Sequence, residues 1–553
     1  MIRLKLLHSL VKVFPEQEPV GELPNGMTVF RNERLHFQLA VYLDRQNLGA
    51  QPLQFAAEGA LASFVTAERV GLVPCGFPAY DGADGYLFTE PRLAPDVLYP
   101  LENGCTEVVP GRFESLWLTV DGTRDPLPDG EHTLRLTVTA GEDTATTEVA
   151  VCVLPAELPP QQLLFTQWLH SDGIAWQHRA PMFSERFWTI LEDYVRTAAR
   201  HGITLLYTPL FTPPLDTAIG GERETCQLVD VTLTANGGYR FGFDRLTRWI
   251  DMAHRCGIRH FELSHLFTQW GANAAPKVVA HDAATGEMRR IFGWDTPACG
   301  GEYERFLDAL LPPLDAFLHG AGVSDKCFLH VSDEPGEAHL AAYSAAAAIV
   351  RRGMPGYPIM DAMSEYAIYA QSEVSDPVVA IDHIEPFIAQ DAAPLWGYYC
   401  CGQNREVPNR FIAMPPARDR ITGTLCWQYG LRGFLQWGYN FYNLHHSTAP
   451  IDPYACTDAG CAFPSGDPFS VYPDRRPGHD GCLRSLRLAV FADGLQDHRA
   501  LCLLSSLIGR EETSALLTRL TGGMTMCRYP REAQAVLSLR GAVNEQIMLH
   551  LDR

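Results

Sequence analysis

KCFLHVSDEPGE, residues 326–337, joins a short apolar run to two adjacent carboxylates, a proline and a glycine. The apolar half is typical of a strand that is buried on both faces. The proline and glycine cannot continue that strand, and the alanine-rich segment 337–348 predicts a helix. Asp333 and Glu334 are therefore expected at the carboxyl end of a strand. Catalytic groups collect at this end in barrels of alternating strands and helices.

Two neighbouring carboxylates can share one site only where the regular pleat of the strand has ended, because successive strand residues point to opposite faces. Pro335 makes such an ending plausible. The alternative is structural: Asp333 caps the following helix and Glu334 is a solvated loop residue.

Strand-like and helix-like segments alternate after the polar, proline-containing run AELPPQQ (156–162), as in a parallel sheet. Three clear helical segments are Ser184–His201, Phe243–Cys256 and Tyr303–His319. Eight candidate strands are Leu163–His170, Thr204–Phe211, His260–Phe267, Lys326–Ser332, Tyr357–Ala362, Val378–Ile384, Leu395–Cys400 and Gly433–Asn440. Eight such units in series predict a closed (β/α)8 barrel.

The region before this alternation reads as an all-β sandwich, because short alternating runs such as HTLRLTVTA are separated by turn residues. We therefore predict an N-terminal β-sandwich followed by a (β/α)8, TIM-like barrel and C-terminal helices. The predicted domains are 1–157 for the sandwich, 158–510 for the catalytic barrel and 511–553 for a helical extension packed on it. Residues 445–480 are expected to form a long loop on the barrel rim.

The amino-acid composition restricts the classes of molecule that the protein can bind. Among 553 residues, 44 are basic and 65 acidic, giving a formal net charge of -21, which disfavours nucleic acid and anionic membranes. The opening MIRLKLLHSLVKVF resembles neither a signal peptide nor an anchor, and no apolar run reaches membrane-spanning length. Fifteen cysteines, an odd number, indicate reduced thiols in the cytoplasm. A homo-oligomer is compatible with the sequence.

Aromatic and polar residues recur at the predicted carboxyl ends of the strands. Aromatic faces combined with amide, imidazole and carboxylate groups suit a sugar, whose C–H faces stack on rings while its hydroxyls need hydrogen bonds. Singly, each residue has a structural explanation. The predicted substrate-binding residues are Trp168, His170, Asp172, His265, Gln269, Trp270, Asp361, Glu385, Tyr398, Trp437, Tyr439 and Asn440.

No metal or other cofactor is predicted. His265 with His260, or His170 with Asp172, could ligate a metal, but the chain has no zinc-type Cys/His spacing and no acidic calcium loop. It also has no glycine-rich phosphate loop, nucleophile elbow or dinucleotide-binding fingerprint.

Five segments resemble the family known as domain of unknown function 4091, which is related to the β-N-acetylgalactosaminidases of glycoside hydrolase family 123. They are RNERLHFQLAVYL (31–43), APDVLYP (94–100), HVSDEPGE (330–337), GFLQWGYNFY (433–442) and RSLRLAVFADGLQDHRAL (484–501). The resemblance implies a β-sandwich ahead of a (β/α)8 barrel. It also implies a retaining mechanism in which the 2-acetamido oxygen of the substrate attacks in place of an enzyme carboxylate.

Carried onto this sequence, the resemblance implies that Glu334 is the general acid/base and that Asp333 orients and stabilises the acetamido group. Adjacent acids push their pKa values apart, which suits a pair with one protonated and one charged member. Substrate assistance is a recognised departure from the two-carboxylate scheme.

Three functions are compatible with these residues. The first is an exo-acting β-N-acetylhexosaminidase on a small oligosaccharide or glycoconjugate, with N-acetylgalactosamine as the best single sugar. The second is a conventional retaining glycosidase with Glu334 as acid/base and Asp382 or Glu385 as nucleophile. The third is a carbohydrate-binding protein without turnover.

Overall fold

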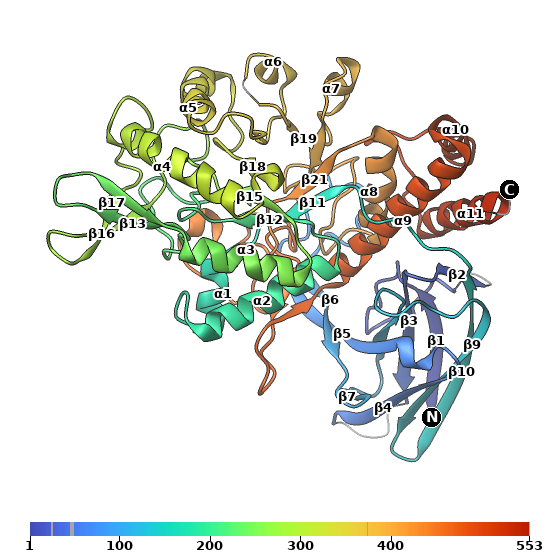
Figure 1. Cartoon of the computed structure of the whole chain (residues 1–553). Coiled ribbons are helices and arrows are strands. Elements are labelled where there is room, and N and C mark those ends of the chain that lie inside the picture. The colour runs from blue at the N-terminus through green and yellow to red at the C-terminus, as the bar shows by residue number, and fades with distance from the viewer. Residues whose placement is uncertain (24–25, 45–48, 373, 552–553) are drawn as a thin grey trace.

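Two five-stranded sheets form the N-terminal part of the computed structural model, which describes residues 1–23, 26–44, 49–372 and 374–551 (Figure 1). One sheet has the order β1 (Ile2–His8), β3 (Arg34–Leu43), β8 (Phe113–Asp121), β5 (Val65–Cys75) and β6 (Arg92–Pro100). The other has the order β2 (Met27–Phe30), β10 (Asp143–Leu154), β9 (Gly130–Ala140), β4 (Gln51–Glu58) and β7 (Cys105–Val108).

The two sheets face each other across a hydrophobic cluster of their own. In β9, Leu134, Leu136 and Val138 are buried in this cluster, while the residues between them face outward, as a half-buried strand requires. In β8 both faces are buried, because Leu118 belongs to this cluster whereas Trp117 belongs to the large core of the following region. The sheet that contains β8 therefore packs on both sides.

Parallel strands follow, in two sheets rather than the one continuous ladder expected for a closed barrel. One sheet has the order β11 (Leu164–Gln167), β21 (Gly433–Gln436), β20 (Trp396–Tyr398) and β19 (Val378–Ala380). The other has the order β12 (Leu205–Thr208), β15 (His260–Leu263) and β18 (Cys327–Leu329). All pairings within these two sheets are parallel.

Single backbone contacts connect these two sheets. The amide of Thr204 donates to the carbonyl of Phe165 at 2.9 Å on one side. On the other side, Ile359 bridges to Leu329 and Ala362 bridges to Val378. The predicted strand 357–362 thus makes isolated bridges but no regular strand, and Pro358, which lacks an N–H, removes one donor from it.

The helices predicted at 184–201, 243–256 and 303–319 are present, with ends within one residue of those expected. The helix predicted over 337–348 begins with a 3-10 turn at Glu337–His339 and continues as an α-helix over Leu340–Gly353. The hydroxyl oxygen of Ser184 accepts from the amide of Phe187 at 3.2 Å and starts α2, whereas Gly257, with φ of 96°, ends α3. The helices before the C-terminal group are α1 (Ser171–His178), α2 (Glu185–Arg200), α3 (Asp244–Cys256), α4 (Glu302–Gly320), α5 (Leu340–Gly353), α6 (Tyr366–Tyr369), α7 (Glu385–Ala389) and α8 (Pro416–Tyr429).

Four strands of one mixed sheet, which has one parallel and two antiparallel pairings, were not predicted. They form one sheet on the left of Figure 1 and consist of β14 (Tyr239–Gly242), β13 (Asp230–Leu233), β16 (Val278–Asp282) and β17 (Met288–Phe292). The turn Asn236-Gly237-Gly238 between two alternating runs was a hairpin signal in the sequence. In the expected rim loop 445–480, the structure has one short strand, β22 (Val471–Pro473), which pairs with β23 (Cys482–Arg484).

The C-terminal helices are α9 (Leu486–Ile508), α10 (Arg510–Thr521) and α11 (Ala533–Leu551), and the last two residues of the predicted extension lie outside the described part. Helix α9 lies between the N-terminal sheets and the parallel strands (Figure 1). It packs against α8 so closely that a Cβ on Gly423 would lie 1.8 Å from the carbonyl oxygen of Gly494. Only glycine fits there.

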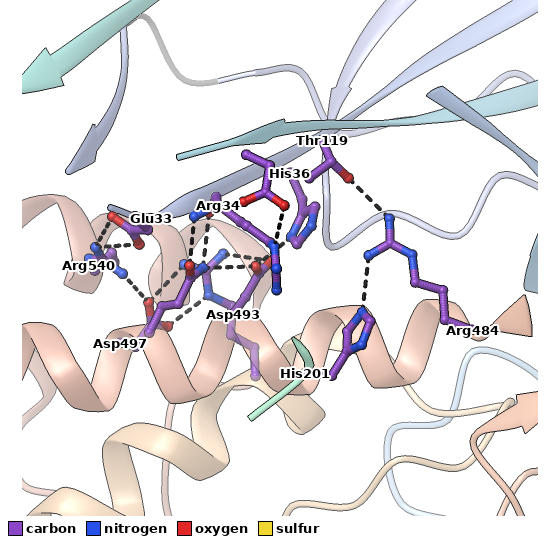
Figure 2. A network of polar contacts seen from close by, with 12 residues as sticks. Glu33, Arg34, His36, Thr119, His201, Arg484, Asp493, Asp497 and Arg540 are labelled. Atoms are coloured by element: carbon purple, nitrogen blue, oxygen red, sulfur yellow. Dashed lines mark hydrogen bonds and ion pairs between the residues drawn. The ribbon is translucent and has the colours of Figure 1, made fainter. Parts of the chain in front are cut away.

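Buried ion pairs link these helices to the N-terminal sheets. Arg540 of α11 binds both oxygens of Glu33, at 2.7 and 2.9 Å, as Figure 2 shows. Arg487 of α9 binds Asp96 of β6 through two contacts of 2.9 Å, and Asp96 has no exposed surface. Among the described residues, no helix is long and apolar enough to cross a membrane.

Candidate active site

The Asp333-Glu334 pair lies beyond the end of β18, where the chain runs beside residues 266–270. The amide of Phe267 donates to the carbonyl of Val331 at 3.2 Å, and the amide of Trp270 donates to that of Asp333 at 3.1 Å. Glu334 has a left-handed φ of 46°. Such a conformation costs of order 1–3 kcal/mol in a residue with a side chain and is concentrated at functional sites. The regular pleat has ended before the pair.

Asp333 is partly buried, and its surroundings change the pKa of its carboxyl group. Burial, followed by the charge of Glu334, raises the pKa of Asp333 well above its usual range. Desolvation disfavours the charged form, and a second carboxylate nearby adds to that effect. The free protein therefore favours the neutral form of Asp333.

Glu334 is exposed, and its carboxylate is held by a hydrogen bond from Tyr398. The hydroxyl of Tyr398, at the end of β20, donates to Oε1 of Glu334 at 2.7 Å and lies 3.2 Å from Oγ of Ser364. Burial, and then Glu334 itself, raises the pKa of Tyr398 well above 10. Tyr398 consequently remains a hydrogen-bond donor to Glu334 at neutral pH.

A buried histidine, His330, lies between two carboxylates and acts electrostatically on Asp333. Nδ1 of His330 is 2.9 Å from Asp361, and its Nε2 is 2.6 Å from Glu262. Burial lowers the pKa of His330, but the hydrogen bonds to Asp361 and Glu262 outweigh it and raise the pKa to about 9. The charged imidazolium thus offsets part of the negative charge of Asp361 and Glu262 near Asp333.

Asp361, which we predicted to bind substrate, has no exposed surface. It accepts hydrogen bonds from the amide of Val331 at 3.1 Å and from the hydroxyl of Tyr343 at 2.6 Å. In the structure it holds the backbone that leads into Asp333.

The raised pKa of His330 predicts a pH-dependent stability. Because the pKa is about 9 in the folded chain and about 6.5 in an unfolded one, the stabilisation is complete below pH 6.5 and is lost as the pH rises through 9. This difference corresponds to about 3 kcal/mol. The midpoint of thermal unfolding of the wild type should fall across this window. His330→Gln, although less stable throughout, should lack that component, and an identical pH slope in both proteins would contradict the assignment.

Two predicted residues, Trp168 and His265, lie in the wall next to His330. Nε1 of Trp168 donates to Glu262 at 2.5 Å, and the ring of His265 stacks on that of His330 with centroids 4.1 Å apart. Nδ1 of His265 contacts the hydroxyl of Tyr207 at 3.0 Å, whereas its buried Nε2 has no partner among the described residues. A substrate group could satisfy that nitrogen.

His170, Asp172 and Asn440 form a second buried cluster, around Arg223. The guanidinium of Arg223 binds both oxygens of Asp172, at 2.8 and 2.6 Å, and contacts Nδ1 of His170 at 3.1 Å. Burial, followed by Arg223, lowers the pKa of His170 to about 3, so that it is neutral. Asn440 exchanges two hydrogen bonds with the backbone of His170, at 2.8 and 2.9 Å. Arg223 lies in an irregular loop and was not predicted, because no sequence signal marked it.

Gln269 and Trp270 lie on the segment beside the acid pair. Trp270 is 36% exposed and shares a backbone hydrogen bond with Asp333, and its ring approaches that of His446 at 5.7 Å. The side-chain oxygen of Gln269 accepts from the amide of Asp216 at 2.7 Å, but its buried Nε2 has no partner among the described residues.

The three remaining predicted residues have other environments. Nε1 of Trp437 donates to Asp467 at 2.9 Å. Tyr439 is fully buried in the large core, and its hydroxyl donates to the carbonyl of Tyr194. Glu385, in the first turn of α7, accepts from the hydroxyl of Tyr429.

Two groups of side chains could hold a metal ion within the described residues. One consists of Asp216, His445 and His446, and the other of His265, His330 and Asp361. Two imidazoles and one carboxylate are ligands that suit zinc and related divalent ions. In the second group, however, both nitrogens of His330 are already hydrogen-bonded to carboxylates.

A model of the glycoside hydrolase 123 catalytic domain matches residues 168–504. A family 123 glycoside hydrolase from Clostridium perfringens, whose structure was described for glycolipid glycan hydrolysis, superposes with a TM-score of 0.74 at 13% identity. The alignment covers 100% of this chain and 98% of that chain, and at this identity it shows the fold. No curated protein matches.

Two further solved structures have much lower similarity. A β-glucuronidase from Parabacteroides merdae aligns with a TM-score of 0.28 at 10% identity, over 79% of this chain and 46% of that chain. A GH10 xylanase with a bacterial Ig-like domain, from termite gut, aligns with a TM-score of 0.29 at 9% identity, over 86% of this chain and 99% of that chain.

Proposed function

The chain belongs to the glycoside hydrolase 123 family, and from this premise we propose that it is a retaining exo-β-N-acetylhexosaminidase that uses the acetamido group of its substrate as the nucleophile. Family membership makes the protein a glycoside hydrolase, in agreement with the enzyme predicted from the sequence and against a binding protein without turnover. The mechanism, the sugar and the roles of the residues are the proposed part.

The unequal environments of Asp333 and Glu334 carry the proposal. Glu334 has a left-handed backbone conformation, and its exposed carboxylate accepts a hydrogen bond from the Tyr398 hydroxyl. The carboxyl group of Asp333 is more buried and interacts electrostatically with His330. A general acid must reach the glycosidic oxygen at the open side of a site. A carboxylate that supports a developing cation acts best where water is excluded.

The raised pKa of Asp333 indicates where the proton of the pair lies before substrate binds. In the free enzyme, burial favours the proton on Asp333. When the N–H of the acetamido group donates to Asp333, that carboxyl is favoured in its charged form, and the shared proton is transferred to Glu334. Glu334 then protonates the leaving oxygen while the acetamido oxygen attacks the anomeric carbon.

The second step returns the proton. Water attacks the anomeric carbon of the cyclic oxazolinium intermediate and gives a proton to Glu334, which restores the acetamido group and the original configuration. Throughout, the negative charge of Asp333 offsets the positive charge on the five-membered ring. His330 supports this arrangement by binding Asp361 and Glu262 and offsetting part of their negative charge.

The conventional mechanism with Asp382 or Glu385 as nucleophile has less support. Asp382 contacts Nδ1 of His383 at 2.8 Å and Nε2 of Gln403 at 3.0 Å, and Glu385 accepts from Tyr429. Within the described residues, no hydrogen bond connects either carboxylate to Asp333 or Glu334.

Several finer assignments complete the proposal. The substrate is a small oligosaccharide or glycoconjugate with a terminal β-N-acetylgalactosamine, which suits the hydrolysis of glycolipid glycans described for the Clostridium perfringens structure. Fifteen cysteines without a disulfide support a cytoplasmic location. Membership of domain of unknown function 4091 is retained from the sequence resemblance.

The architecture that we propose is one eight-unit barrel with the sandwich at residues 1–157, the barrel at 158–510 and the helical extension at 511–553. The contacts of Thr204 with Phe165, of Ile359 with Leu329 and of Ala362 with Val378 support closure of the two parallel sheets into one ring.

A comparison of two substrates tests the mechanism. The wild type should hydrolyse an aryl β-N-acetylgalactosaminide and should be inactive on the aryl β-galactoside, because the second substrate lacks the nucleophile. An N-acetyl thiazoline, which mimics the oxazoline, should inhibit competitively. Comparable turnover of the plain galactoside would reject substrate assistance and favour the mechanism with Asp382 or Glu385.

A further inference from the structure

A large cleft lies between the N-terminal sheets and the end of α2, away from the acid pair. Its volume is about 1080 Å³, and it adjoins a second cavity of about 430 Å³. Four residues line both cavities: Arg34, Arg124, Arg200 and His201. Arg200 and His201 lie before the amino end of the parallel strand β12, whereas Asp333 follows the carboxyl end of β18. The cleft is thus separate from the candidate active site.

The lining of the two cavities is positively charged, although the whole chain has a formal net charge of -21. Five arginines face three carboxylates among the lining residues: Arg34, Arg124, Arg200, Arg484 and Arg499 against Glu68, Asp121 and Asp125. A cleft that concentrates one sign of charge raises the local concentration of ligands of the opposite sign.

Three of these arginines have internal partners. Nε of Arg499 donates to the carbonyl of Pro159 at 2.7 Å. Nε of Arg34 binds Asp121 at 2.9 Å. Arg484 binds Glu68 at 3.1 Å and donates to Oγ1 of Thr119, also at 3.1 Å. Figure 2 shows Arg484 between Thr119 and His201.

His201 adds no charge to the cleft. Its Nδ1 is 2.7 Å from the carbonyl of Thr197, which can only accept, so this nitrogen carries the proton. Its Nε2 is 3.2 Å from Nη1 of Arg484 and must accept from that guanidinium. Burial, followed by Arg484, keeps the pKa of His201 well below 6.5, in agreement with a neutral ring.

Arg124 and Arg200 are different, because their side chains make no hydrogen bond or ion pair within the part of the chain that the structure describes. Both are exposed and can be reached from solvent. Burial, followed by the charges of Arg124 and Arg34, lowers the pKa of Arg200. The positive groups therefore repel one another in the absence of a ligand.

We propose that this cleft binds an oxyanion group, a sulfate, phosphate or carboxylate, between Arg124 and Arg200. The planar guanidinium forms two parallel hydrogen bonds to such groups, and a bound anion relieves the repulsion between the arginines. The volume of the cleft leaves room for a ligand larger than the ion itself. Because Arg124 follows β8 and Arg200 ends α2, the anion connects the N-terminal sheets to α2.

Calorimetric titration of the full chain with sodium sulfate, at an ionic strength held constant with sodium chloride, tests this site. We expect saturable binding to the wild type. Arg124→Gln/Arg200→Gln should weaken it at least about tenfold, because two charge-assisted contacts are removed. Arg519→Gln is the matched control, since Arg519 is an exposed arginine on α10 that makes no ion pair among the described residues.

Saturation and the comparison of variants are both required, because sulfate stabilises folded proteins in general through exclusion from their surface. Equal affinity in the wild type and the double variant, or no saturable binding of sulfate or phosphate, would overturn the proposal. If the double variant fails to fold, Arg124→Gln alone provides the test, because this residue is on an exposed loop.

A second titration identifies the source of the anion. N-acetylgalactosamine 6-sulfate should bind more tightly than inorganic sulfate if the cleft takes the charged end of a glycoconjugate, and equally if it takes a free ion. Both results preserve the oxyanion site. Failure of the acetamido mechanism at Asp333 would leave these titrations unchanged, so the two proposals can fail separately.

Discussion

Glu334→Gln should slow hydrolysis of an aryl β-N-acetylgalactosaminide by about 100- to 10,000-fold, the range for loss of a general acid/base. The amide keeps the size of the side chain and can still meet the Tyr398 hydroxyl, but it cannot deliver a proton. The loss should be smallest for substrates with activated leaving groups, which need little protonation. Steady-state rates over a series of aryl leaving groups measure this dependence.

The leaving-group dependence distinguishes chemistry from a change in folding. Equal loss on every leaving group would argue against an acid role. Tyr398→Phe is the matched control, because it removes the hydrogen bond to Glu334 but leaves the carboxyl group in place. It should reduce the rate less than Glu334→Gln does.

Asp333→Asn should lower the rate on acetamido sugars by about 100- to 1,000-fold. The amide keeps the shape but removes the negative charge that offsets the developing oxazolinium ring. Electrostatic stabilisation of this kind contributes about 3–4 kcal/mol in a site from which water is excluded. Kinetics with and without azide are the measurement.

Azide should not rescue Asp333→Asn, because no enzyme nucleophile has been removed. Recovery of activity with azide, accompanied by a glycosyl azide product, would instead identify Asp333 as a nucleophile. The raised pKa of Asp333 adds a second readout: the variant should also lose the ionisation that belongs to the pair from its pH–rate profile.

Local sequence patterns predicted individual helices and strands better than the pairing of strands into sheets. The helix α2 was predicted from its apolar period and from Ser184, which caps it, and both signals lie within a few residues. Segment 357–362 was predicted as a strand from its apolar residues. Its hydrogen bonds with neighbouring strands depend on partners from two distant segments, and Pro358 removes one N–H donor. The mixed sheet of β13, β14, β16 and β17 was missed, although Asn236-Gly237-Gly238 indicated one of its turns.

The candidate site was predicted in part for the same reason. The sequence Asp333-Glu334-Pro335 is local, and it predicted that a strand ends at two acids. His330 is bound by Glu262, which lies on β15, and by Asp361, which lies in the segment 357–362. Arg223 comes from an irregular loop. These residues are far from one another in the sequence, so no local pattern connects them. Asp361 has the residue type expected of a substrate ligand, and only its burial and its bonds to Val331 indicate a supporting position. The functions of these residues stay predictions.

The buried contact between Arg487 and Asp96 has a consequence for evolution. The guanidinium is on α9, inside the segment that matches the catalytic-domain model, whereas its carboxylate comes from β6, before that segment. Removing one partner of a buried ion pair typically costs about 3–5 kcal/mol. A recombination event that transferred residues 168–504 alone to a new gene would lose that carboxylate, so selection should keep the two regions together as one inherited unit.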